Sequence, residues 1–164
     1  MLPGLSISID DVGRIFLGRV KSNFLIQEFV PKVIYDKYGP NSIWQLDPDL
    51  ILGIQFIRNT VKLPIMINNW HKGGMFQNRG KRRSGTTVGA KDSQHFMGRA
   101  VDFNIIDGTR VWPSKKVFDF IFKHESDIMS AGFTTIENHR HTKGWTHLDM
   151  RSTARFDSIF VVNP

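Results

Sequence analysis

An alternation of apolar and polar side chains runs through residues 100–106 and limits the possible folds more than any other segment. Val101, Phe103 and Ile105 are apolar, and the residues between them are small or polar. Because successive side chains of a β-strand point to opposite faces, the pattern predicts a strand with its apolar face against a core. Asp102 would lie on the other, open face. The chain is therefore expected to build a sheet that presents a carboxylate away from the core.

The other periodic segments predict both helices and strands. The expected helices cover 24–38, a segment that begins at Asp47-Pro48, and 114–132 with Ser114 as its cap; the expected strands cover 63–68, 100–106, 133–137 and 145–150. Helices thus come first, and strands with one helix between them follow. This order predicts the α+β class, with a small, largely antiparallel sheet flanked by helices.

Length and composition favour one domain. With 164 residues, of which 40% are hydrophobic, the chain can bury a core of its own, and we expect a single domain over 1–164. Its longest apolar runs are far shorter than the roughly 20 residues needed to cross a bilayer, so membrane insertion is not expected. The N-terminus lacks the basic start, apolar stretch and cleavage site of a secretory signal, so we expect synthesis in the cytoplasm.

The chain has no cysteine, so a metal site would have to use imidazole and carboxylate groups. Three such residues lie where no apolar side chain is required: His95 before the strand expected over 100–106, Asp102 within that strand and His147 on a later strand. Two imidazoles and one carboxylate are a ligand set that catalytic zinc uses, with a fourth position left to water. Spacing alone leaves other roles open: a turn cap for His95, an exposed carboxylate for Asp102 and a sheet histidine for His147.

The residues around these candidate ligands resemble a family signature. Ser93, His95, Gly98, Ala100 and Asp102 follow one another as the Ser, His, Gly, Ala and Asp of the zinc D-alanyl-D-alanine peptidase family do. That family includes D-Ala-D-Ala carboxypeptidases and phage L-alanyl-D-glutamate endopeptidases, and it shares its fold with the Hedgehog signalling domain. Glycine permits a tight turn after the first ligand, and alanine leaves room beside the metal.

Two further segments resemble family elements, Val-Gly-Ala at 88–90 and Trp-Thr-His-Leu-Asp at 145–149, and the resemblance is densest over 46–151. It implies a Hedgehog-like fold with one zinc ion on the open sheet face, held by the three candidate ligands. It also implies a zinc metallopeptidase that hydrolyses peptide bonds of bacterial peptidoglycan, in the murein stem or cross-bridge. Without a secretory signal, we expect a phage-type lytic enzyme (an endolysin) or a tail-associated enzyme, delivered by a holin or a phage particle.

The resemblance leaves the general base open. Relatives carry a Glu or Asp three residues before the last histidine, or a His two residues before it, but this chain has Gly144 and Trp145 there. The nearest candidates are Glu137 and His141, which could fold back over the metal because paired positions on adjacent strands lie about 5 Å apart. A polar turn without a catalytic part is the alternative. Asp149, two residues beyond the last ligand, shares its face and could orient an imidazole.

Candidate substrate-binding residues precede the ligands. Family members carry an arginine upstream of the signature that holds the substrate carboxylate or polarises the scissile carbonyl. Arg82 is the first choice here and Arg79 the second, while another alignment places residues 68–71 at this position, with a histidine instead of an arginine. Ser93 lies close enough to the ligands to hydrogen-bond a substrate terminus or a neighbouring ligand, or else it is a turn serine.

Two other functions remain open, one from the charge of the chain and one from the missing base at Gly144 and Trp145. Lys and Arg exceed Asp and Glu by 22 to 15, and this balance of +7 attracts polyanions in general. The sharpest basic cluster, at 79–83, could bind nucleic acid or remain a solvated loop. A metal-stabilised cell-wall-binding module that has lost its base is the other possibility. We expect a monomer with Zn²⁺ as cofactor and peptidoglycan, rather than nucleic acid, as its partner.

Overall fold

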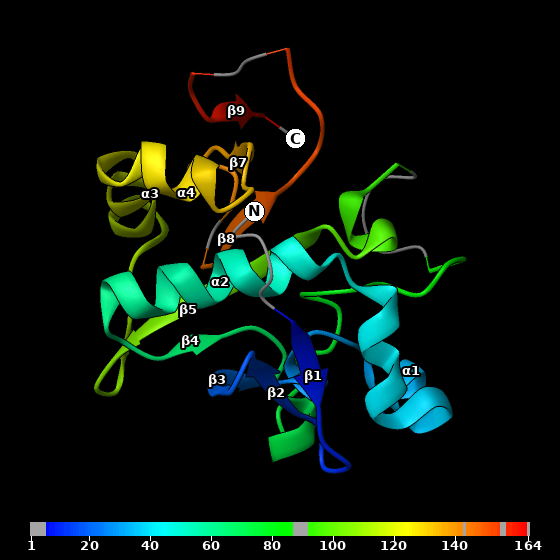
Figure 1. Cartoon of the computed structure of the whole chain (residues 1–164). Coiled ribbons are helices and arrows are strands. Elements are labelled where there is room, and N and C mark those ends of the chain that lie inside the picture. The colour runs from blue at the N-terminus through cyan, green and yellow to red at the C-terminus, as the bar shows by residue number, and fades with distance from the viewer. Residues whose placement is uncertain (1–5, 87–91, 143, 155–156, 164) are drawn as a thin grey trace.

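Two sheets organise the chain in the computed structural model, which describes residues 6–86, 92–142, 144–154 and 157–163 (Figure 1). The first sheet has the order β1-β2-β3, with strands Ile7–Ile9, Arg14–Leu17 and Val20–Leu25. The second has the order β4-β5-β8-β7-β9, with β6 paired to β5; its strands are Ile65–Met66 (β4), Ala100–Asp107 (β5), Arg110–Val111 (β6), Thr135–Glu137 (β7), Thr146–Asp149 (β8) and Phe160–Val162 (β9). β7 and β9 are parallel, and the other pairs are antiparallel.

Helices connect and cover the sheets. They are α1 (Lys32–Tyr38), α2 (Pro48–Val61), α3 (Ser114–Lys123) and α4 (Glu125–Ser130), with the 3₁₀ turns η1 (Ile26–Glu28), η2 (Gly39–Gln45), η3 (Trp70–Lys72) and η4 (Gln94–Met97). α2 begins where the sequence predicts. The side chain of Asp47 accepts the backbone N–H of Asp49 at 3.0 Å, and Pro48 occupies the first turn, where its missing N–H costs nothing.

A large part of the core lies between α2 and β5 (Figure 1). Phe103 and Ile105 on β5 are fully buried, as are Leu50 and Ile54 on α2. This confirms the predicted apolar face of residues 100–106. The opposite face of β5 carries polar side chains, but it is not open as predicted: Asp102 is 7% exposed and Asn104 is 4% exposed, because neighbouring segments cover this face as well.

The predicted helix over 24–38 is wrong in its first half. β3 runs to Leu25 and η1 follows, so that the helix α1 begins only at Lys32. Buried apolar residues from a strand, a 3₁₀ turn and a bend together imitate helical spacing, and Pro31 is the residue that precedes the actual helix. The predicted order, with helices before strands, is also wrong, because β1 to β3 precede every helix of the described chain.

Two other predicted elements differ from the structure. The segment 114–132 forms two helices that meet at His124 rather than one. Ser114 does not cap the first of them: Pro113 is the N-cap residue, and the Ser114 hydroxyl donates to the carbonyl of His139 at 3.2 Å. The strand expected over 63–68 shortens to Ile65–Met66.

The coarse fold class is nevertheless the predicted one, a mixed structure of helices and a small, largely antiparallel sheet. Within the ranges described, none of the helices combines the length and the apolar character that a membrane span requires.

Candidate metal centre

The register of β5 and β8 brings two of the candidate ligands together. Asp102 lies directly opposite His147, and Ala100 lies opposite Asp149. Residues opposite each other in an antiparallel pair share a face, so both ligand side chains project on the side away from α2. The methyl side chain of Ala100 leaves room on this face for the Asp149 carboxylate. The sheet alone thus positions half of the site.

The third candidate ligand, His95, comes from the 3₁₀ turn η4 that precedes β5. Gly98 ends this turn with φ +68°, a left-handed conformation that favours glycine. Its Cα hydrogen also faces the backbone of η2: a Cβ there would lie 2.9 Å from Cα of Leu46. The tight turn and this close approach direct the chain from His95 straight into the strand that carries Asp102.

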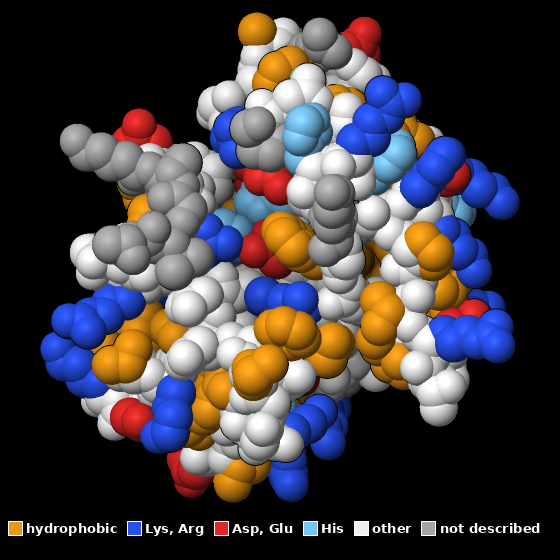
Figure 2. Space-filling model, turned by 180° about the vertical axis from the view of Figure 1, so that it is seen from behind, with side chains coloured by type: hydrophobic (Ala, Val, Ile, Leu, Met, Phe, Trp, Pro, Cys, Tyr) orange, Lys and Arg blue, Asp and Glu red, His pale blue; other side chains and the backbone are white. Residues whose placement is uncertain are grey.

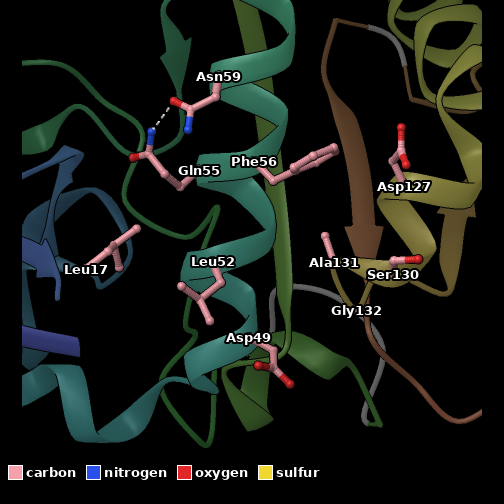
Figure 3. Close-up of a pocket in the computed structure, with 10 residues that line it drawn as sticks. All are labelled: Leu17, Asp49, Leu52, Gln55, Phe56, Asn59, Asp127, Ser130, Ala131 and Gly132. Carbon is pink, nitrogen blue, oxygen red and sulfur yellow. Dashed lines mark hydrogen bonds between the residues drawn. The ribbon is translucent and has the colours of Figure 1, made fainter. Parts of the chain in front are cut away.

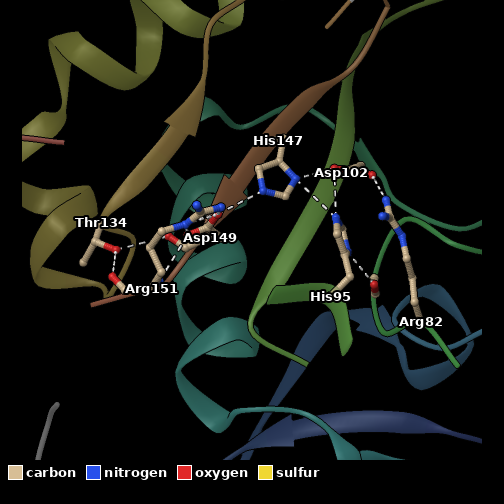
Figure 4. Close-up of polar contacts among 8 residues, drawn as sticks. Arg82, His95, Asp102, Thr134, His147, Asp149 and Arg151 are labelled. Carbon is tan, nitrogen blue, oxygen red and sulfur yellow. Dashed lines mark hydrogen bonds and ion pairs between the residues drawn. The ribbon is translucent and has the colours of Figure 1, made fainter. Parts of the chain in front are cut away.

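The three side chains form one buried cluster (Figure 4). Asp102 Oδ1 lies 3.2 Å from His95 Nε2 and 2.7 Å from His147 Nδ1, and the two nitrogens are 3.2 Å apart. The exposed fractions are 1% for His95, 7% for Asp102 and 6% for His147. All three potential ligand atoms lie within 4.8 Å of one another, so the cluster could hold a metal ion.

Each imidazole has an outer nitrogen, which points away from the other candidate ligands, and the protonation of these outer nitrogens indicates whether the cluster can bind a cation. His95 Nδ1 lies 2.6 Å from the carbonyl of Gly80, and His147 Nε2 lies 3.1 Å from Asp149 Oδ2. Both neighbours only accept hydrogen bonds, so each outer nitrogen carries the proton. The inner nitrogens of neutral rings are then lone pairs that face each other and a carboxylate. A proton or a metal cation must lie among these atoms, and a divalent cation could be bound by both inner nitrogens and the carboxylate oxygen together.

The charges of the cluster follow from its burial and hydrogen bonds. Burial raises the pKa of Asp102, but hydrogen bonds to both histidines and their charges outweigh it and hold the pKa below its usual range. Burial lowers the pKa of His147, but hydrogen bonds to Asp102 and Asp149 and the charges of Asp102 and Glu137 raise it to about 9. Without a metal, the cluster therefore retains a proton at neutral pH.

The structure places Arg82 and Arg79 beside the cluster. The Arg82 guanidinium donates to Asp102 Oδ2 at 3.0 Å and to the carbonyl of Asn78 at 2.9 Å. Arg79 donates to Asn104 Oδ1, and its guanidinium lies 3.5 Å from the centre of the Phe76 ring. Arg82 thus contacts a candidate ligand, whereas Arg79 lies further along the face of β5.

Other predicted site residues lie in different surroundings. Asp149 contacts His147, as predicted for a residue that orients an imidazole. Ser93 precedes η4, and its hydroxyl makes no cap hydrogen bond. His141 is exposed in the turn before β8, and in the described chain no contact joins its side chain to the cluster. His71, from the other alignment, packs edge-to-face against Trp70 with a ring distance of 5.8 Å and lies outside the cluster.

Glu137 lies on the strand next to the last ligand. The register of β7 and β8 places Ile136 opposite Leu148, so Glu137 comes opposite His147 and on the same face. Its side chain is half-buried, and its charge acts on His147 and on Arg151. Of the two candidate bases, Glu137 is the one that the fold brings to the cluster.

Sequence reasoning missed three groups of the site. The Gly80 carbonyl holds His95, Arg151 holds Asp149, and Asn104 binds Arg79 while donating to the carbonyl of Gly144. A backbone carbonyl leaves no signal in a sequence. Asn104 and Arg151 did carry a signal, because each continues the two-residue period of a ligand strand on the ligand face.

In Figure 2, histidine and acidic side chains lie at the bottom of a hollow, with Lys or Arg side chains beside them. A separate cavity of about 550 Å³ lies between α2, the end of β2 and the end of α4 (Figure 3). Its lining includes Phe56, Asp49 and Asp127 but none of the predicted site residues. This cavity is therefore distinct from the candidate metal centre.

The Val-Gly-Ala segment at 88–90 lies outside the described residues. Comparisons of the chain with protein-family models, with curated proteins and with solved structures found no match. The chemistry of the site is therefore inferred from its own residues.

Proposed function

We propose that the chain is a zinc-dependent peptidase that hydrolyses peptide bonds of bacterial peptidoglycan, with His95, Asp102 and His147 as the zinc ligands and a Hedgehog-like fold around them. The observation that carries the proposal is the buried cluster of two imidazoles and one carboxylate whose inner atoms converge on one point. The resemblance of residues 93–102 and 145–149 to the zinc D-alanyl-D-alanine peptidases supplies the substrate class.

The donor set fits zinc in number and type. Two histidine nitrogens and one carboxylate oxygen leave one tetrahedral position free, which is the pattern of catalytic rather than structural zinc. Both histidines are held by an acceptor on their outer nitrogen, as zinc-binding histidines usually are. A zinc ion in such a site polarises a carbonyl group and lowers the pKa of a water molecule toward neutrality.

The residues of the chain supply the remaining steps. Glu137 lies on the ligand face opposite His147 and can accept a proton from the attacking water and return it to the leaving amine. Arg79 can bind a carboxylate of the stem peptide, since its guanidinium lies along β5 two residues beyond Asp102, at Asn104. Arg82 is already engaged by Asp102, so we assign it to holding that ligand.

Digestion of purified peptidoglycan, followed by mass spectrometry of the released peptides, tests the proposal. We expect the wild type to generate new amino termini. Glu137→Gln should slow this by about 100-fold or more, with zinc content unchanged, because a general base contributes about 10²–10⁴-fold. His141→Gln is the matched control and should cleave within a few-fold of the wild type.

The same experiment separates the alternatives. Equal cleavage by His95→Ala would rule out the zinc mechanism. A reversed result, with His141→Gln inactive and Glu137→Gln active, would move the base to the turn. Zinc and wall binding by the wild type without any release of peptides would favour the cell-wall-binding module that Gly144 and Trp145 suggest, because relatives carry an acid or a histidine at these positions.

A further inference from the structure

Arg151, on the segment after β8, binds the carboxylate of Asp149, which contacts the candidate ligand His147 (Figure 4). Its Nε lies 2.9 Å from Asp149 Oδ1 and 3.0 Å from Asp149 Oδ2, and a terminal nitrogen donates to Oδ2 as well. Its backbone N–H donates to Oδ1 at 3.1 Å. Three nitrogens of one residue thus hold both oxygens of a single carboxylate.

The carboxylate itself is fully enclosed. The Asp149 side chain has an exposed fraction of 0%, whereas that of Arg151 is 39% exposed. A buried charge needs a partner and hydrogen bonds, and among the described residues the side chain of Asp149 is bonded by Arg151 and His147. Arg151 therefore supplies the compensating charge for a carboxylate whose other contact is a candidate metal ligand.

Arg151 is itself held in place. Its carbonyl accepts the hydroxyl of Thr134 at 2.6 Å, and the preceding residue, Met150, donates its N–H to the carbonyl of Arg99 at 3.1 Å. The segment is thereby fixed on one side to the residue that leads into β7 and on the other to the residue that leads into β5. The guanidinium is consequently presented to Asp149 from a fixed backbone.

The opposite end of the cluster has a matching arrangement. Arg82 binds the outer oxygen of Asp102, and Arg151 binds the carboxylate that holds His147. Each strand ligand is therefore backed by an arginine. A planar guanidinium can fix the rotation of a carboxylate through two parallel hydrogen bonds, which the single ammonium group of a lysine cannot do.

We propose that Arg151 is a positioning residue of the metal centre: by fixing Asp149, it orients the His147 ring so that Nδ1 faces the metal. The inference rests on the metal centre of the proposed function but not on the peptidase reaction. Loss of such supporting contacts typically lowers metal affinity by about 10–100-fold.

Zinc affinity, measured by competition with a chromogenic chelator, tests this role. We expect Arg151→Met to weaken zinc binding by about 10–100-fold, and Arg151→Lys to fall between it and the wild type. Arg14→Met is the matched control, since Arg14 forms an ion pair with Asp10 at the surface at 3.6 Å. It should bind zinc as the wild type does.

Two further measurements separate positioning from mere stabilisation. The visible absorption of the cobalt(II)-substituted protein should change in Arg151→Met, because it reports the ligand geometry. Asp149→Asn should add little to the loss already caused by Arg151→Met, because both act through His147. Unchanged zinc affinity and an unchanged cobalt spectrum, accompanied only by a lower unfolding temperature of the metal-free protein, would overturn the inference. So would independent, additive effects of the two substitutions.

The readout also distinguishes this inference from the proposed function. Zinc binding that depends on Arg151, in a wild type that releases no peptides, would support the positioning role while the peptidase proposal fails. Absence of zinc binding by the wild type would overturn both.

Discussion

The candidate metal centre has two halves that are built in different ways. Asp102 and His147 lie on adjacent strands and face each other because the β5–β8 ladder places them in register. His95 and Arg82 lie on irregular chain, where single backbone contacts hold them: the Arg82 N–H donates to the carbonyl of His95 at 3.0 Å, and the His95 ring contacts the Gly80 carbonyl. The strand half depends on a repeating pattern and the loop half on individual close approaches.

The difference predicts how each half fails. On the strands, a substitution removes one side chain and leaves the ladder of backbone hydrogen bonds in place. In the loop, a substitution that shifts the backbone displaces a ligand several residues away. In the strand half, substitutions should therefore affect metal binding mainly by removing a side chain that contacts the metal. In the loop half, they should affect it mainly by adding atoms that force the backbone to move.

The largest effect is expected for Asp102→Ala. The substitution removes the only candidate ligand that carries a negative charge and leaves the largely buried Arg82 beside two histidines without its carboxylate. We expect complete loss of zinc by elemental analysis, and a lower stability by about 3–5 kcal/mol, the cost of breaking a buried pair. Asp119→Ala, which removes an exposed ion pair on α3, should change neither quantity measurably. One zinc per chain in Asp102→Ala would contradict the assignment.

A smaller effect, confined to the strand half, is expected when pH is varied without metal. The pKa of His147 is raised to about 9 from 6.5, so the folded protein holds this proton more tightly than the unfolded chain. The stabilisation is therefore fully present below pH 6.5 and lost as the pH rises through about 9. We expect the free energy of unfolding in urea with a chelator to fall by on the order of 2 kcal/mol across this window.

The dependence should vanish in His147→Gln and persist in His141→Gln. A profile that stays flat between neutral pH and pH 9 in the wild type would show that the carboxylates do not hold this proton.

The smallest of these effects, and the one that probes the loop half, is expected for Gly80→Ala. A Cβ at this position would lie 2.8 Å from the carbonyl carbon and 2.9 Å from Cα of Phe29, so the backbone must move. The movement displaces the Gly80 carbonyl that accepts the proton of His95. We expect zinc affinity to fall by about tenfold, in the range typical of lost supporting contacts, with an unchanged circular dichroism spectrum.

Ser84→Ala, in the same loop and exposed, is the control for Gly80→Ala. Equal zinc affinities for the two variants would mean that the loop half does not depend on this close approach.

The same division explains how much could be predicted from the sequence. The strand half was predictable, because the alternation over 100–106 and the His-x-Asp pattern at 147–149 fix which side chains share a face. α2 was predictable from its cap and its proline. In the loop half, residue type made His95 a candidate ligand, but only the family resemblance linked it to the two strands, since no periodic pattern fixes the distance between His95 and the strands.

Other features could not be predicted from the sequence, for identifiable physical reasons. The apolar spacing over 24–38 fits a helix even though part of it is strand, because burial on one side looks similar in both. Whether Arg82 faces a substrate or a ligand depends on one hydrogen bond to Asp102, which spacing cannot supply. That Glu137 rather than His141 lies beside the candidate ligands follows only from the register of β7 and β8.

The pairing of Asp102 with His147 has a consequence for how the protein reaches its native state. If β8 slipped by one residue against β5, every side chain of β8 would change faces, and His147 would point into the core beside Phe103. No ligand set would then exist. A bound metal would stabilise only the native alignment of β5 and β8. Metal binding would therefore increase the free-energy difference between the correctly paired sheet and a misaligned one.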